Sequence, residues 1–144
     1  MAGHDHLGHG TSVSPGAPRL YFGPRGSWDL VEADLFARHQ LVRQNFPDVP
    51  VFLMGHSMGS FLARTFLIRH PGAVEGAIIM GTGQPSSAVL AAGKILIDRE
   101  ARRKGTDILP STLAGRLSFA AYNRRFAPNR TDFDWLSRNP ETVD

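Results

Sequence analysis

Residues 51–59 read VFLMGHSMG, an apolar run that ends in the pattern Gly-x-Ser-x-Gly. The run predicts a short buried strand over residues 51–54, followed by a sharp turn at Ser57 and a helix that begins at once. The turn consists of Gly55, His56, Ser57, Met58 and Gly59. We expect side chains at the two glycine positions to clash with the neighbouring strand and helix. Ser57 would then stand exposed at the carboxyl end of the strand.

The residues after the turn extend this pattern. Residues 60–70 are apolar at most positions and predict a helix that stops at Pro71-Gly72. A second apolar run at residues 77–80 ends in Gly-Thr-Gly. Strand, helix and strand in about thirty residues form a βαβ unit, which requires a parallel sheet. The fold class is therefore α/β, and the continuous apolar runs predict strands that are covered on both faces.

Ser57 is a candidate nucleophile. A serine hydroxyl reacts well only when a base takes its proton and donors stabilise the oxyanion that forms. In the predicted turn, the backbone N–H of Met58 is one such donor. His56 is expected to pack or hydrogen-bond beside the nucleophile rather than act as its base, because its side chain points away from that of Ser57. The competing interpretation is a serine that only caps the helix.

Three segments of the chain are similar to one known family. Residues 51–83, with their GHSMG core, resemble α/β-hydrolases of the monoacylglycerol lipase and lysophospholipase type, often labelled serine aminopeptidases. DHLGHG at residues 5–10 resembles the family's DHRGHG, with Leu7 in place of arginine, and residues 133–138 resemble part of the lid of bacterial members. The resemblance implies a partial α/β-hydrolase fold, with a core over residues 1–83 and a helical lid over residues 84–144.

The resemblance also implies a function. It points to cleavage of a carboxylic ester in a lipid-like small molecule, a monoacylglycerol or a lysophospholipid, through an acyl-enzyme at Ser57. An amidase or aminopeptidase stays open, because the turn around the serine looks the same for either. No organic cofactor and no metal are implied. The oligomeric state is left open.

The other two members of a catalytic triad are not identified. The family places them in the order serine, acid, histidine, well downstream of the nucleophile. Of the 87 residues after Ser57, only His70 is a histidine, and twelve helical residues would place it roughly 18 Å away. Aspartates are present at positions 98, 107, 132, 134 and 144, but no further core strand precedes any of them. The rival hypothesis is therefore a non-catalytic hydrolase fragment that acts at most as a binding module.

Strand number and the carboxyl terminus bear on whether the chain is complete. Two strands covered on both faces need further strands at their outer edges. Asn139-Pro140-Glu141 is a typical helix start, yet the sequence stops three residues later. We therefore expect a piece of a longer protein.

The first residues lack a signal-peptide pattern and the chain contains no cysteine, so a cytoplasmic location is expected.

Three further helices are predicted outside the βαβ unit. One runs from Ser27, as cap, to about Asn45 and buries residues at helical spacing, namely Trp28, Val31, Leu35 and Val42. The others cover residues 87–104 and 111–125. The first of these is basic towards its end, and the net charge of the chain is +3. This small excess favours a solvated helix face over nucleic-acid binding, and a lipid surface could contact the lid.

The amino-terminal histidines form a candidate metal cluster. His4, Asp5, His6 and His9 are close in sequence, and imidazole and carboxylate suit zinc. Their spacing matches no established ligand pattern, and the family segment accounts for most of them. The sequence therefore predicts no metal site.

Overall fold

The computed structural model describes residues 1–24, 26–105, 122–131 and 133–143. The chain divides into two compact units, Met1–Pro85 and Ser86–Asp144. The expected boundary between a hydrolase core and a lid at residues 83–84 stays a prediction. Each unit is described by itself below.

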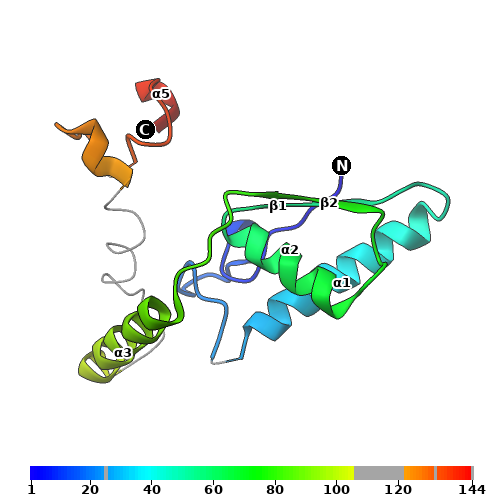
Figure 1. Ribbon diagram of the computed structural model, residues 1–144, viewed down its shortest axis with the longest axis horizontal. Coiled ribbons are helices and arrows are strands. Elements are labelled where there is room, and N and C mark those ends of the chain that lie inside the picture. The colour runs from blue at the N-terminus through cyan, green and yellow to red at the C-terminus, as the bar shows by residue number, and fades with distance from the viewer. Residues whose placement is uncertain (25, 106–121, 132, 144) are drawn as a thin grey trace. The chain divides into compact units, whose positions relative to one another are not determined.

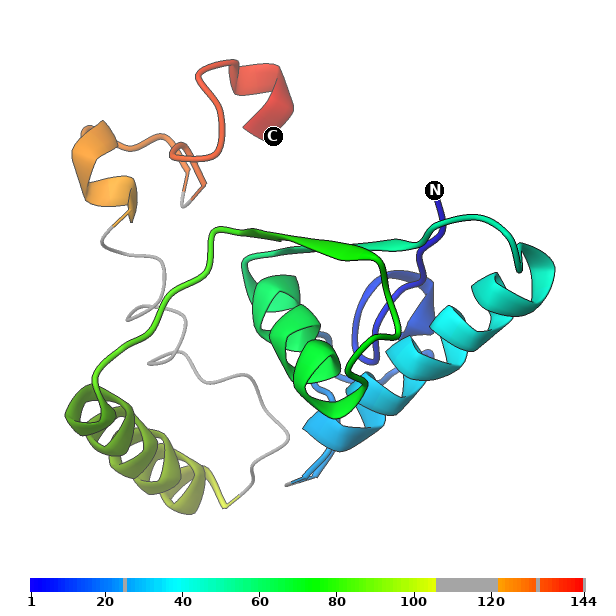
Figure 2. The ribbon, with the colours of Figure 1, turned by 45° about the vertical axis from the view of Figure 1, so that its right-hand side comes forward.

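The first unit contains the predicted βαβ arrangement. Its elements are the 3₁₀ helix η1 (Gly10–Ser12), α1 (Trp28–Asn45), β1 (Phe52–His56), α2 (Met58–Arg69) and β2 (Gly76–Met80). The two strands pair in parallel, in a register that runs from Phe52 opposite Gly76 to His56 opposite Met80. Both ribbon views show α1 and α2 on the same side of this sheet (Figure 1, Figure 2). α2 contacts both strands, and α1 packs against α2.

The core of this unit lies where α2 meets β1 and α1. Leu62, Ala63 and Phe66 of α2 are buried together with Val31 of α1. Leu62 and Phe66 are four residues apart, so they lie one turn above the other on one face of the helix. Burial of side chains of this size contributes about 1.5–3 kcal/mol each relative to exposure. This contact holds α2 on the sheet and thereby positions the turn that connects it to β1.

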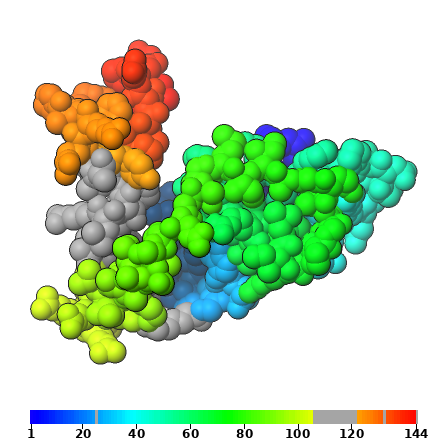
Figure 3. Space-filling model, viewed as in Figure 1, coloured from blue at the N-terminus to red at the C-terminus, as the bar shows by residue number. Residues whose placement is uncertain are grey.

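The sheet face opposite α2 is uncovered among the described residues. Side chains alternate along a strand, so Phe52 and Met54 share that face with Ile78 and Met80. Their exposed fractions are 64%, 61%, 51% and 44%. Both described helices of the unit pack on the other side, so the expectation of strands covered on both faces stays a prediction. Figure 3 shows the green stretch that includes β2 at the surface of the first unit.

α1 has the predicted bounds but not the predicted cap. Ser27 already has helical backbone angles, φ −65° and ψ −9°, and its side chain accepts no hydrogen bond from the helix. Its hydroxyl instead donates to the Pro24 carbonyl at 2.6 Å. Of the four residues expected to be buried, Val31 is completely so, and Trp28, Leu35 and Val42 are half-buried.

Glu75 connects the starting ends of the two strands. One of its carboxylate oxygens accepts a hydrogen bond from the Val51 N–H at 2.5 Å, and the other forms an ion pair with Arg43 of α1 at 2.6 Å. The Arg43 hydrogen bond, followed by the Val51 N–H, lowers the pKa of Glu75 below its usual value. Arg43 also donates to the Ala73 carbonyl at 2.9 Å. One carboxylate therefore joins β1, β2 and α1 at the end of the sheet remote from Ser57.

The second unit contains the predicted helix α3 (Ser87–Lys104), the short 3₁₀ helix η2 (Arg124–Phe126) and α5 (Pro140–Val143). The α3 helix ends at Gly105, which has a φ of +65°. Asn139 caps α5 by accepting a hydrogen bond from the Glu141 N–H at 3.1 Å. Most of the helix expected over residues 111–125 lies outside the described residues. No helix in the described part of the chain is long and apolar enough to cross a bilayer.

Candidate active site

Ser57 occupies the single-residue turn between β1 and α2. Its backbone angles are φ 51° and ψ −117°, a region that residues other than glycine rarely adopt. Strain of this kind costs about 1–3 kcal/mol and persists only where the surroundings over-determine the conformation. Leu20, with a φ of 63°, is the other described non-glycine residue with a positive φ. Strained residues are concentrated at functional sites, and of these two Ser57 is the one with a nucleophilic side chain.

Hydrogen bonds on both sides of Ser57 hold this conformation. Its N–H donates to the Met80 carbonyl at the end of β2, at 3.0 Å. Its carbonyl accepts two hydrogen bonds from Ser60 in the first turn of α2, one from the N–H at 2.9 Å and one from the hydroxyl at 2.5 Å. The residue is therefore fixed to the neighbouring strand and to the following helix at once.

The side chain of Ser57 does not cap α2. It accepts no hydrogen bond from the helix, although the residue occupies the N-cap position. Ser57 is exposed, and its hydroxyl has no hydrogen-bond partner among the described residues. The interpretation of Ser57 as a helix cap is therefore wrong. The hydroxyl faces solvent at the carboxyl edge of the parallel sheet, where α/β folds bind their ligands.

The two glycines of the Gly-x-Ser-x-Gly pattern, Gly55 in β1 and Gly59 in α2, differ in what they permit. A Cβ added to Gly55 would overlap the Gly59 carbonyl oxygen and would also lie 2.9 Å from the Ala63 Cβ. The expected clash is therefore present at Gly55, where the helix backbone approaches the strand closely. A Cβ added to Gly59 meets nothing within 4 Å among the described residues. The expected clash at Gly59 is wrong, because this residue approaches β1 through its backbone while its own Cβ position is open.

Met58 is the first residue of α2. The first N–H groups of a helix have no partner within it and carry the positive end of the helix dipole. The Met58 N–H is thus free to face an anion beside Ser57. The role of oxyanion donor stays a prediction from the sequence.

His56 packs against the end of β2. A Cβ added to Gly81, which has a φ of +57°, would lie 3.1 Å from the His56 Nε2. The imidazole is exposed and lies beside the Gly81 backbone. The expected place of His56 beside the nucleophile stays a prediction.

His70 is engaged at the far end of α2. Its Nε2 is 2.8 Å from the Glu32 carboxylate, and its ring stacks on Phe36 with centroids 3.9 Å apart. Among the described residues, no imidazole is hydrogen-bonded to Ser57.

Of the aspartates considered as triad acids, Asp98 pairs with Lys94 and Asp134 closes a turn through Thr131. Asp132 and Asp144, together with Asp107, lie outside the described residues.

The DHLGHG segment forms a turn that is closed by Asp5. The Asp5 carboxylate accepts hydrogen bonds from the N–H and the hydroxyl of Thr11, both at 2.8 Å. The Thr11 N–H is the larger cause of the lowered pKa of Asp5.

The histidines of this segment have separate surroundings. His9 stacks on Phe22, and burial lowers the pKa of His6. No group of three potential metal ligands occurs among residues that the structure describes.

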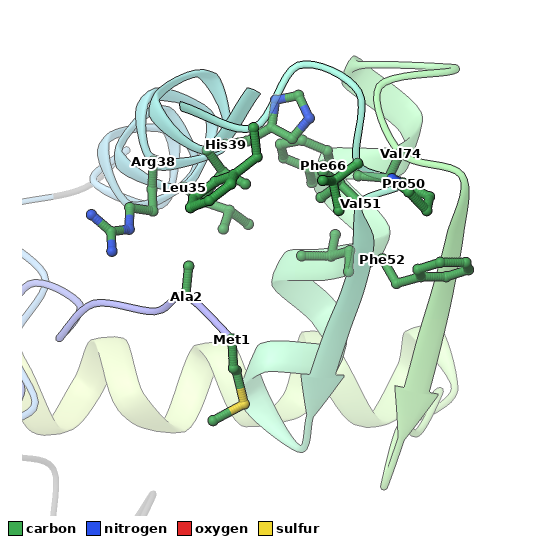
Figure 4. A pocket seen from close by; sticks show the side chains of 14 residues that line it. Met1, Ala2, Leu35, Arg38, His39, Pro50, Val51, Phe52, Phe66 and Val74 are labelled. Carbon is green, nitrogen blue, oxygen red and sulfur yellow. The ribbon is translucent and has the colours of Figure 1, made fainter. Parts of the chain in front are cut away.

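A cavity of about 430 Å³ lies in the first unit between α1, the segment 46–51 and the start of β1. Figure 4 shows Leu35 and His39 of α1 on one side of it and Val51 on the other, while the Phe52 ring points away from α1. Phe52 begins β1, whereas Ser57 follows its last residue. The cavity is therefore at the opposite end of the strand from the candidate nucleophile.

Two residues important to this unit were missed by sequence reasoning. Glu32 is buried, and its place four residues after Trp28 on one face of α1 was a signal for that burial. Ser60 is completely buried, and only its place three residues after Ser57 could have indicated a bond to that carbonyl.

Comparison with known proteins agrees with the fold. Residues 1–144 match the family model for serine aminopeptidase, S33. The monoglyceride lipase of Mus musculus is 27% identical and that of Rattus norvegicus 29%, each over 95% of this chain and 41% of the relative. A carboxyl esterase from Bacillus coagulans, solved with glycerol, superposes with a TM-score of 0.76 at 25% identity, over 96% of this chain and 44% of that one. The chain thus spans about two fifths of the length of these curated relatives. Because the family model matches residues 1–144 throughout, this chain belongs to the serine aminopeptidase S33 family of α/β-hydrolases.

Proposed function

We propose that Ser57 is the nucleophile of an ester hydrolase that acts on lipid-like carboxylic esters. The observation that carries the proposal is the backbone of Ser57, held at φ 51° and ψ −117° with an exposed hydroxyl that caps nothing. The end of a strand does not by itself require a strained backbone, and such strain is typical of functional sites.

The proposed chemistry is acyl transfer in two steps. A base takes the proton of Ser57 as its Oγ attacks the ester carbonyl carbon, and the Met58 N–H donates to the oxyanion that forms. The alcohol leaves with a proton, and an acyl-enzyme remains on Ser57. Water then attacks the acyl group, so that the carboxylic acid is released and the hydroxyl is restored. The base is a further residue of the protein, since His70 is bound to Glu32.

The substrate class rests on the relatives and on α3. Curated relatives are named monoglyceride lipases, and the solved relative is a carboxyl esterase in complex with glycerol. In the second unit, Val89, Leu90 and Ile95 of α3 have exposed fractions of 62%, 58% and 54%. An exposed apolar helix face suits contact with an acyl chain or a lipid surface. We therefore favour a monoacylglycerol or a lysophospholipid over an amide or a peptide.

The test is labelling of the purified chain with a fluorophosphonate probe, beside Ser57→Ala and a matched control, Ser14→Ala, on the loop before α1. We expect labelling of the unmodified chain and of the control, and none of Ser57→Ala. Unlabelled protein from the same preparation would then be assayed on a monoacylglycerol, a lysophospholipid and an aminoacyl amide, because the probe blocks the Ser57 hydroxyl covalently. Faster release from the esters than from the amide supports the substrate class.

A second candidate function is a non-catalytic binding module, which the engagement of His70 by Glu32 favours. It predicts that a folded sample shows no labelling at Ser57 and still binds a non-hydrolysable ether analogue of a monoacylglycerol. Amide spectra by NMR would establish folding and binding on the same sample.

A further inference from the structure

The buried hydroxyl of Ser60 forms a hydrogen bond with the backbone of Ser57. Ser60 has an exposed fraction of 0%, and its hydroxyl donates to the Ser57 carbonyl at 2.5 Å. The Ser60 N–H donates to the same oxygen at 2.9 Å. Two donors from one residue therefore fix the carbonyl group that follows the candidate nucleophile.

That carbonyl belongs to the same rigid unit as the Met58 N–H. A peptide group is planar, and in its trans form the C=O and N–H bonds point in opposite directions. Rotation of the Ser57–Met58 peptide would move both groups together. Any restraint on the Ser57 oxygen is therefore a restraint on the direction of the Met58 N–H.

We propose that Ser60 is a positioning residue for the oxyanion donor of this hydrolase. By holding the Ser57 carbonyl inside the first turn of α2, it directs the Met58 N–H towards the place where the oxyanion forms. This inference rests on the proposed role of Ser57. The direction of a donor is important because oxyanion stabilisation depends on dipoles that are fixed before the charge develops.

The bond differs from an ordinary contact between a hydroxyl and its own helix. Thr65, in the same helix, donates to the Phe61 carbonyl at 3.0 Å, and both of these residues lie within α2. Ser60 instead bonds to the strained residue that precedes the helix. Its removal leaves the Ser57 oxygen with the Ser60 N–H as a partner, so no buried group loses all its hydrogen bonds. We therefore expect Ser60→Ala to remain folded.

The experiment compares the full chain with Ser60→Ala and with Thr65→Val. The Thr65 change removes a helix bond of the ordinary kind, and it also removes the hydrogen bond that the Thr65 hydroxyl accepts from the Trp28 indole N–H at 3.2 Å. Residual dipolar couplings of ¹⁵N-labelled protein report the direction of the Met58 N–H. The rate of fluorophosphonate labelling, measured against probe concentration, separates probe binding from reaction at Ser57. In Ser60→Ala we expect a changed dipolar coupling for the Met58 N–H and a limiting labelling rate that is about tenfold lower. This loss is smaller than the loss of about a hundredfold or more that removal of a whole oxyanion donor causes. Probe affinity in Ser60→Ala, and both readouts in Thr65→Val, should stay unchanged.

Unchanged Met58 couplings in Ser60→Ala overturn the proposal, as does an unchanged limiting rate in a chain that labels. If the unmodified chain does not label at all, the proposed function fails, and the couplings alone then decide whether Ser60 directs the Met58 N–H. Should Ser60→Ala prove unfolded by circular dichroism, Ser60→Cys replaces it, because a thiol of similar shape is a much weaker donor.

Discussion

His70 and Glu32 are joined across the contact of α2 with α1 by a hydrogen bond of 2.8 Å between Nε2 and Oε1. The other oxygen of Glu32 pairs with Arg69 at 3.1 Å. The Glu32 side chain is only 6% exposed, and a buried carboxylate needs such partners to offset the loss of water. The histidine nearest after the candidate nucleophile is thus committed to the packing of two helices.

The first prediction concerns His70. We expect His70→Gln to leave the rate of fluorophosphonate labelling at Ser57 within about twofold, because the imidazole is at the other end of α2. The same change should lower the free energy of unfolding by about 1 kcal/mol, the typical net value of one hydrogen bond. Loss of labelling in a variant that urea denaturation shows to be folded would make His70 the base after all.

The second prediction concerns the buried carboxylate. Glu32→Gln should lower the free energy of unfolding by about 2 kcal/mol, because hydrogen bonds to a charged group are stronger than neutral ones. Asp29→Asn is the matched control, since Asp29 pairs with the same Arg69 but its side chain is 65% exposed. We expect the control to change the free energy by less than about 1 kcal/mol. Equal losses in the two variants, by urea denaturation, would refute a special role for burial.

The third prediction contrasts the two glycines of the turn. Gly55→Ala should lower the free energy of unfolding by about 3 kcal/mol or more, because the added carbon overlaps the Gly59 carbonyl and the core is closely packed. Gly59→Ala should be neutral or slightly stabilising, since alanine favours a helix over glycine. Thermal unfolding of both variants measures the difference. Similar midpoints for the two would show that α2 does not approach β1 as closely as described.

The fourth prediction is a pH dependence. Because the pKa of Glu75 is lowered in the folded chain, the folded state binds its proton less readily than the unfolded state. The stability that Glu75 contributes is therefore present above the ordinary glutamate pKa and is lost as the pH falls through the lowered value. We expect Glu75→Gln to reduce the fall in thermal midpoint between pH 6 and pH 3. An identical fall in both proteins would mean that the links of Glu75 to Arg43 and Val51 do not contribute.

Local patterns in the sequence predicted the elements of the first unit well. The apolar runs of β1 and β2, the helix between them and the bounds of α1 and α3 follow from hydrophobic spacing and from breakers such as Pro71-Gly72. These features depend on neighbours within a few residues. The turn at Ser57 belongs with them, because the Gly-x-Ser-x-Gly pattern limits which backbone can follow an apolar strand.

Contacts between distant residues decided the rest. The sequence by itself determined a βαβ unit with an exposed serine at its turn, since the pattern and the glycines there are local. Only the tertiary structure decided that Ser57 caps nothing, that Ser60 and Met80 hold its backbone, and that His70 belongs to Glu32. It also decided that one sheet face is open among the described residues. The Ser60 bond is local, and the open face depends on which side of the sheet the helices pack. The contacts with Met80 and Glu32 bring groups that are far apart along the chain within about 3 Å, the range in which a hydrogen bond forms and which no local pattern encodes.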